Sequence, residues 1–364
     1  MRNKSERAEG LGYFNLAKGM GILLILAGHS ITPVLAQMQT GKIFSGAGSV
    51  LGGGVIAAFF MISGFGFYKR SMKKCFSIQC RLLLRPYGIV AAAVLGTRGL
   101  LAILEQRSFL EHGGELVLTY LLGLNAEGGG TLLGIPIESV SIFWFVLALF
   151  VGWMIYNWVM QMKSPARRTE MIVSCVILGY GLTLIAKVWP FCLPMGLLAA
   201  GYLAAGRQMR EERLLERKLP VWCMGILLGV AGISAAFGQV NIVACVWKLG
   251  IIDVAGSFCV GFLLLRLYAW FMKKQGDQEK TGRIRGLIEE VGFYSIWIVC
   301  LHAYEKIIIP WYRVYGILRA YPWLAVAICF IGRCLIMYGI YKGIFWIKGK
   351  QKRKGKKPKI RIEE

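Results

Sequence analysis

Two ionisable side chains, Lys18 and His29, fall within the first apolar run of the sequence. Their eleven-residue spacing places them on nearly the same face of a helix, about 16 Å apart along its axis. If a membrane span begins near Gly19, Lys18 lies at the cytoplasmic interface and His29 near the bilayer centre. Imidazole titrates near neutral pH and can act as a general base, so an ionisable group at this depth is a functional candidate. A neutral imidazole hydrogen-bonded between helices explains the same pattern.

A second histidine, His302, lies about eleven residues into a late apolar run, at a depth similar to that of His29. We therefore expect that the two rings can meet. Glu305 follows one helical turn later on the same face, where its carboxylate could orient His302 or pair with Lys306. A carboxylate inside a bilayer is costly unless another group compensates it.

Other polar side chains in the apolar runs have both a functional and a structural interpretation. Ser63-Gly64 leaves one hydroxyl facing a neighbouring helix, and close helix packing explains this pair without function. Trp144 could stack on a sugar ring, although aromatic belts at the membrane interface also predict such a residue. Three arginines fall within apolar runs and could face a polar cavity: Arg98, Arg266 and Arg333.

The composition identifies the environment of these residues. Of the 364 residues, 56% are apolar and 17% are charged, an imbalance that a water-soluble fold of this length could not bury. A formal charge of +24 raises nucleic acid as a partner. However, the basic residues lie in short loops between apolar runs of about 20 residues, each long enough to cross a bilayer core. The sequence therefore predicts an all-α polytopic helix bundle in membrane lipid and no nucleic-acid partner.

We predict about ten transmembrane helices in one membrane domain, residues 1–347. They lie near Tyr13–Leu35, Leu51–Phe67, Pro86–Leu104, Ser141–Met162, Met171–Trp189, Phe191–Gly206, Val221–Phe237, Ile251–Phe271, Val291–Ile309 and Trp323–Trp346. Two shorter apolar stretches, Leu116–Leu124 and Asn241–Leu249, are expected to be re-entrant or interfacial. The positive-inside rule places both termini in the cytoplasm, and residues 348–364 form a basic cytoplasmic tail that we expect to be disordered.

Cysteine and histidine usage argues against a metal site. The sequence has ten cysteines but no CxxC pair, and it has only three histidines. Most of the cysteines fall within or beside apolar runs, which is typical of free, buried thiols. We therefore expect no bound metal.

Several segments together resemble one family of membrane enzymes. A basic residue, ten intervening residues and a histidine, from Lys18 to His29, precede the segment Phe59-Phe60-x-x-Ser63-Gly64-Phe65. Three further segments agree: Arg81 to Pro86, Ile142 to Phe145, and Ser295 to His302. In these segments the chain resembles the acyltransferase-3 family of integral membrane O-acyltransferases. The chain departs from the family pattern at Lys18, where most members have arginine, at Asn15, where many have aspartate, and in the four-residue spacing of Arg81 and Arg85.

The resemblance implies a bacterial multi-pass protein of the plasma membrane. It implies transfer of an acyl group, with acetyl-CoA as the expected form of the acyl-CoA co-substrate. The donor is cytoplasmic, and the acceptor is a hydroxyl of an extracytoplasmic carbohydrate or glycolipid.

The resemblance also assigns roles to residues. His29 corresponds to the family's essential histidine and is the expected general base, with His302 and Glu305 as further catalytic candidates. Three cations are expected to bind the phosphates of coenzyme A at the cytoplasmic mouth, although the positive-inside rule also explains them: Lys18, Arg81 and Arg85. Ser63 and Trp144 are expected to line the site.

Two other functions remain compatible with the sequence. In a transporter or channel, His29 and His302 would relay protons or bind solute. Neither inverted repeats nor paired Gly/Pro-broken helices are evident, which counts against this function. A non-catalytic membrane sensor could use the same helix bundle.

Overall fold

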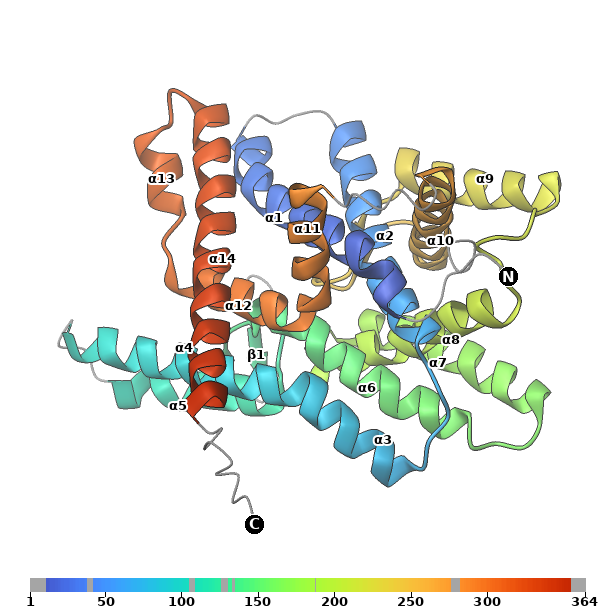
Figure 1. Ribbon diagram of the computed structural model, residues 1–364, viewed down its shortest axis with the longest axis horizontal. Coiled ribbons are helices and arrows are strands. Elements are labelled where there is room, and N and C mark those ends of the chain that lie inside the picture. Colours follow the sequence, from blue (N-terminus) through green and yellow to red (C-terminus); the bar gives the residue numbers. More distant parts are fainter. Residues whose placement is uncertain are drawn as a thin grey trace, which may run out of the picture.

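The computed structural model describes residues 11–37, 42–104, 109–125, 130–132, 135–186, 188–275 and 282–354. These residues are mostly helical, and their strands are confined to two short antiparallel hairpins (Figure 1). The predicted all-α polytopic bundle is therefore confirmed.

The helices follow one another along the chain with short connections. The first seven are α1 (Asn15–Gln37), α2 (Lys42–Phe65), α3 (Met72–Gln79), α4 (Arg85–Leu104), α5 (Phe109–Leu122), α6 (Trp144–Val159) and α7 (Pro165–Ile185). The others are α8 (Leu193–Glu211), α9 (Val221–Phe237), α10 (Ile251–Gln275), α11 (Arg283–Phe293), α12 (Ser295–Ile308), α13 (Tyr312–Ile317) and α14 (Pro322–Lys354). Short helical turns are η2 (Leu11–Phe14), the π-helical η3 (Cys80–Leu84), η4 (Ser141–Phe143) and η5 (Pro190–Cys192). The hairpins pair β1 (Gly130–Leu132) with β2 (Ile135–Ile137), and β3 (Val240–Asn241) with β4 (Val246–Trp247).

Seven helical segments within the described ranges are long and apolar enough to cross a membrane. They are Gly12–Leu35, Gly48–Phe65, Met72–Leu104, Ser141–Val159, Pro165–Ile185, Ile251–Lys274 and Pro322–Ile340. The other three predicted spans correspond to α8, to α9 with 17 residues, and to the region of α11 and α12. The predicted run from Val291 to Ile309 is not one continuous helix, because the backbone leaves helical geometry at Tyr294 (φ −95°, ψ 20°).

Two other predicted segments differ in their secondary structure. Leu116–Leu124 falls mainly within α5, whereas Asn241–Leu249 contains the β3–β4 hairpin. α14 continues to Lys354, so the first residues of the predicted disordered tail are helical, as the high helix propensity of Lys and Arg allows. The remainder of that tail, residues 355–364, lies outside the described residues.

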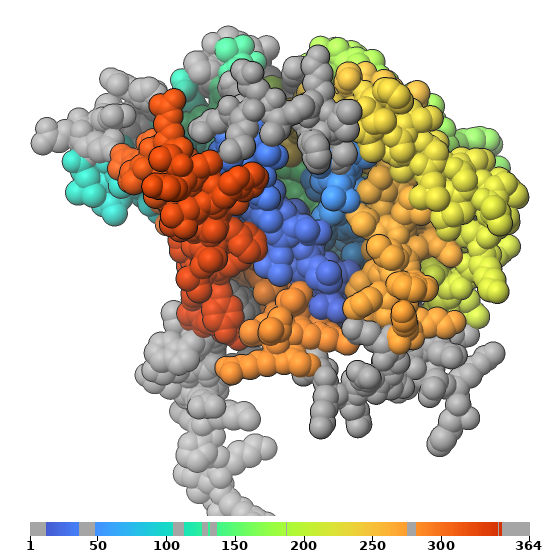
Figure 2. Space-filling model, turned by 90° about the horizontal axis from the view of Figure 1, so that it is seen from above, coloured from blue at the N-terminus to red at the C-terminus, as the bar shows by residue number. Residues whose placement is uncertain are grey.

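The helices form two connected groups. α2 packs against α8, α9 and α10, and α8 packs against α6 and α7. In the second group, α1 packs against α11 and α14, and α12 packs against α4 and α14. Figure 2 shows α1 and α2, in blue, recessed between red α14 on one side and yellow and orange α9 and α10 on the other. The first apolar run, α1, therefore packs mainly against helices from the end of the chain.

Two glycines allow α2 and α8 to cross closely. A Cβ atom on Gly64 would lie 2.1 Å from the backbone oxygen of Leu203, and one on Gly206 would lie 1.8 Å from that of Met61. The packing that Ser63-Gly64 indicates in the sequence is therefore present at this crossing.

We expect Gly206→Ala to lower the free energy of unfolding by about 1–3 kcal/mol, because an added methyl group overpacks this crossing. Thermal unfolding in detergent micelles measures the change. Gly229→Ala is the matched control, because a Cβ on Gly229 in α9 would meet nothing within 4 Å. Equal melting temperatures for the two variants would contradict the close crossing.

Candidate functional site

The structure brings the two predicted catalytic histidines together. His29 of α1 and His302 of α12 have ring centroids 5.2 Å apart, with their planes inclined by 50°. His302 is only 3% exposed, and His29 is half-buried. α1 and α12 contact each other, and both pack against α14. Two imidazoles from opposite ends of the sequence thus share one interior site.

Glu305 is the centre of a buried polar network beside these rings. Its Oε2 accepts a hydrogen bond from His302 Nδ1 at 2.7 Å. Its Oε1 accepts from Arg333 Nη1 of α14 at 3.0 Å and from the indole Nε1 of Trp311. Glu305 is 0% exposed and Arg333 4% exposed, so the ion pair is removed from solvent. The sequence suggested that Glu305 orients His302 or pairs with Lys306. The structure shows the contact with His302, and Arg333 is a counter-ion that the sequence did not indicate.

The Glu305 contact determines which nitrogen of a neutral His302 carries the proton. An ionised carboxylate can only accept hydrogen bonds, so Nδ1 of His302 is the donor and Nε2 keeps its lone pair. His302 Nε2 is buried and has no hydrogen-bond partner within the described part of the chain. It is therefore available to accept a proton or a hydrogen bond.

The end of α12 positions the second half of the network. The helix ends at Ile308, because Pro310 disfavours helical geometry in the residue before it. The following turn leads into α13, and Trp311 points back to Glu305. The Tyr315 hydroxyl of α13 donates to the backbone oxygen of Ser30 at 2.8 Å, directly beside His29. α13 thus ties the Glu305 network to the helix that carries His29.

A family model described as an acyltransferase domain matches residues 11–342. The chain belongs to the acyltransferase-3 family. It is thus a membrane acyltransferase that does not transfer amino-acyl groups. None of the curated proteins and none of the solved structures compared with this acyltransferase matches it.

The predicted donor-binding cations of the acyltransferase lie on different helices. Lys18 is half-buried in α1, next to Gly19, whose added Cβ would lie 2.0 Å from the backbone oxygen of Ile288 in α11. Arg81 lies in the π-helical turn η3 and Arg85 begins α4, and both are exposed. No hydrogen bond or ion pair engages these three side chains within the described ranges. Their charges are not neutralised by the described protein.

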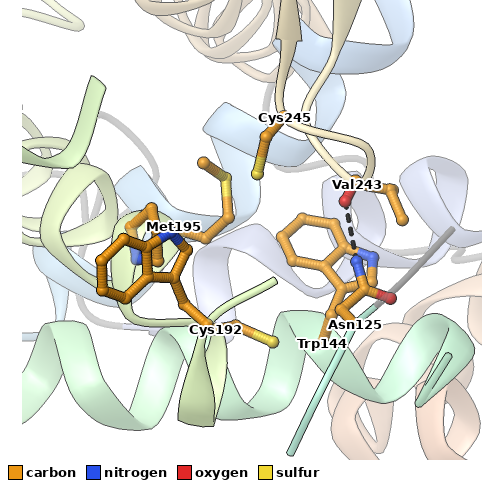
Figure 3. A pocket seen from close by; sticks show the side chains of 8 residues that line it. Asn125, Trp144, Cys192, Met195, Val243 and Cys245 are labelled. Atoms are coloured by element: carbon orange, nitrogen blue, oxygen red, sulfur yellow. Dashed lines mark hydrogen bonds between the residues drawn. The ribbon is translucent and has the colours of Figure 1, made fainter. Parts of the chain in front are cut away.

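Trp144 and Ser63 are not part of the histidine network. Ser63 is half-buried in α2 beside the α8 crossing. Trp144 lines a separate hollow, shown in Figure 3, whose empty volume of ≈ 260 Å³ includes space open to solvent. The Asn125 amide on its wall donates to the backbone oxygen of Val243 at 2.7 Å. None of the predicted catalytic residues lines this hollow.

Sequence reasoning missed the contacts of Trp311 and Arg333 with Glu305. It placed Arg333 within a span but assigned it no partner. A guanidinium and a carboxylate in neighbouring apolar runs are a signal for pairing, because each is costly alone in a membrane. Trp311 carries no comparable signal, since an interfacial belt explains a tryptophan next to a span. Within the described ranges, no group of three or more His, Cys, Asp or Glu side chains could hold a metal ion.

Proposed function

We propose that this acyltransferase transfers an acetyl group from cytoplasmic acetyl-CoA to a hydroxyl of an extracytoplasmic glycan or lipid-linked sugar, in the plasma membrane of a bacterium. The observation that carries the proposal is the close pair of imidazoles, half-buried His29 and buried His302, with the His302 ring held by Glu305. A sugar hydroxyl is a poor nucleophile at neutral pH, and an imidazole is a suitable base for it.

In the proposed reaction, His29 takes the proton of the acceptor hydroxyl while the oxygen attacks the thioester carbonyl carbon. The new carbon–oxygen bond forms, the carbon–sulfur bond breaks, and the proton passes from His29 to the thiolate of coenzyme A. His302 Nε2 is available to accept a hydrogen bond from protonated His29, because Glu305 holds the proton of His302 on Nδ1. The cation that forms on His29 is thereby stabilised inside the protein.

In the same proposal, Lys18, Arg81 and Arg85 bind the phosphates of the donor. We expect Arg85→Gln to raise the apparent KM for acetyl-CoA about tenfold with little change in kcat, because a charge-assisted hydrogen bond contributes about 1.5–3 kcal/mol. Initial rates of label transfer from radiolabelled acetyl-CoA in inside-out vesicles give both constants. Arg167→Gln is the control, because Arg167 is an exposed arginine at the start of α7. An unchanged KM in Arg85→Gln would remove this residue from the donor site.

Mass spectrometry of surface glycans tests the function itself. Cells that produce the protein are expected to carry a glycan heavier by one acetyl group than cells that lack it or produce His29→Ala. The mass difference identifies the acyl group, and its release by mild alkali identifies an ester. Solute uptake by sealed vesicles without consumption of acetyl-CoA would instead show a transporter.

A further inference from the structure

We propose that Trp311 and Arg333 are positioning residues for acyl transfer, which hold the Glu305 carboxylate so that His302 presents its bare Nε2 beside His29. This inference rests on the proposed function. Both residues lie within the matched domain, residues 11–342, but outside the short motif segments from which the sequence suggested the family.

The geometry holds the carboxylate from three sides. Trp311 and Arg333 both donate to Oε1 of Glu305, and His302 donates to Oε2. Arg333 Nη1 also lies 3.3 Å from Oε2. The donors come from α12, from the turn after α12 and from α14. Rotation of the carboxylate would break at least one of these bonds, so its oxygens are fixed relative to the imidazole.

Trp311 and Arg333 also contact each other directly. The guanidinium carbon of Arg333 lies 4.9 Å from the centroid of the Trp311 ring, a cation–π arrangement. The indole therefore supports the arginine with its face while it donates to Glu305 with its Nε1–H. Each of the two residues keeps the other in place for the same carboxylate.

The charge of Arg333 matters for the chemistry of His302. An uncompensated carboxylate in an apolar interior takes up a proton instead of staying ionised. Arg333 supplies the compensating charge, because its Nη1 lies 3.0 Å from Oε1 of Glu305 and both side chains are buried. The ion pair leaves Oε2 of Glu305 as the acceptor for Nδ1 of His302.

Conservative substitutions separate positioning from simple stabilisation. Trp311→Phe keeps an aromatic ring under Arg333 and removes only the N–H donor. Arg333→Lys keeps the charge and removes the planar guanidinium. Arg98→Met is the matched control, because Arg98 also lies in an apolar helix and pairs with a glutamate, Glu138, at 2.7 Å, but this pair is largely exposed.

The experiment measures label transfer from radiolabelled acetyl-CoA to alkali-labile esters in inside-out vesicles that contain the full-length protein. Only variants that elute as folded protein in detergent are compared. We expect Trp311→Phe and Arg333→Lys to lower kcat by about 10- to 100-fold, the range that loss of a partner of a histidine or carboxylate ligand causes in metal sites, with KM for acetyl-CoA unchanged. Arg98→Met is expected to match the wild type.

A double variant tests whether Trp311 acts through Glu305. We expect Trp311→Phe combined with Glu305→Met to be no slower than Glu305→Met alone, because methionine has no oxygen to accept the indole N–H and the second change then removes no further hydrogen bond. Two results would overturn the inference: a wild-type kcat in both Trp311→Phe and Arg333→Lys, or losses in kcat that multiply in the double variant. Neither result would contradict the proposed function, as long as the wild-type protein transfers label. Absence of label transfer by the wild-type protein, with donor and native membranes present, would overturn the proposed function itself.

Discussion

His29→Ala is expected to lower the rate of acyl transfer by about 10²- to 10⁴-fold, the usual contribution of a positioned general base. The substitution removes the imidazole that lies beside His302 and leaves α1 otherwise intact. Because His29 is half-buried and forms no hydrogen bond within the described part of the chain, the loss of its side chain should affect folding little. Rates in inside-out vesicles and the yield of folded protein in detergent measure the two effects separately.

Thr32→Ala provides the matched control for His29. Thr32 lies on the same helix, is exposed, and donates a hydrogen bond to the backbone oxygen of Gly28 at 2.8 Å. The Thr32→Ala variant should transfer acetyl groups at the wild-type rate. Transfer by His29→Ala at the rate of Thr32→Ala would show that His29 is not the base.

Arg333→Met is expected to lower the free energy of unfolding by about 3–5 kcal/mol, because it leaves a buried carboxylate without its counter-ion. Glu305 is fully buried, so water cannot replace the lost charge pair. Glu305→Met combined with Arg333→Met should recover much of this loss, since two apolar side chains then occupy the site of the ion pair. Thermal and chemical unfolding in detergent compare the wild type, both single variants and the double variant.

The exposed ion pair between Arg98 and Glu138 sets the scale for this comparison. Arg98→Met should change stability by about 1 kcal/mol at most, because water screens exposed pairs. If Arg333→Met is as stable as Arg98→Met, Glu305 does not depend on Arg333 for its charge. A Glu305→Met, Arg333→Met double variant that is less stable than both single variants would also show that Glu305 does not depend on Arg333 for its charge.

The fold class could be predicted because a bilayer constrains the length and polarity of every helix that crosses it. Apolar runs as long as α2, α6 and α10 have few alternatives to spanning the membrane. The break at Tyr294 was not predictable in this way, since Tyr294 lies within the apolar run that begins at Val291. Hydropathy records how apolar a segment is, but it does not report whether the backbone stays helical.

The site was predictable in part for a related reason. Equal depths along two spans suggested that His29 and His302 could meet, and the structure places them in one site. The partners of Glu305 depended on which helices pack together, and the sequence contains no direct record of that arrangement. Trp311 reaches the carboxylate only because the chain turns back after α12. Such contacts follow from tertiary structure and not from spacing.

The length of α12 matters for its contact with the surrounding lipid. Its 14 residues extend only about 21 Å, less than the roughly 30 Å of an average hydrocarbon core. However, α12 packs against α4, α14 and α1, and half of its residues, His302 and Glu305 among them, are buried. Neighbouring helices therefore shield this short helix from most acyl chains, so its polar residues need no lipid-compatible partner.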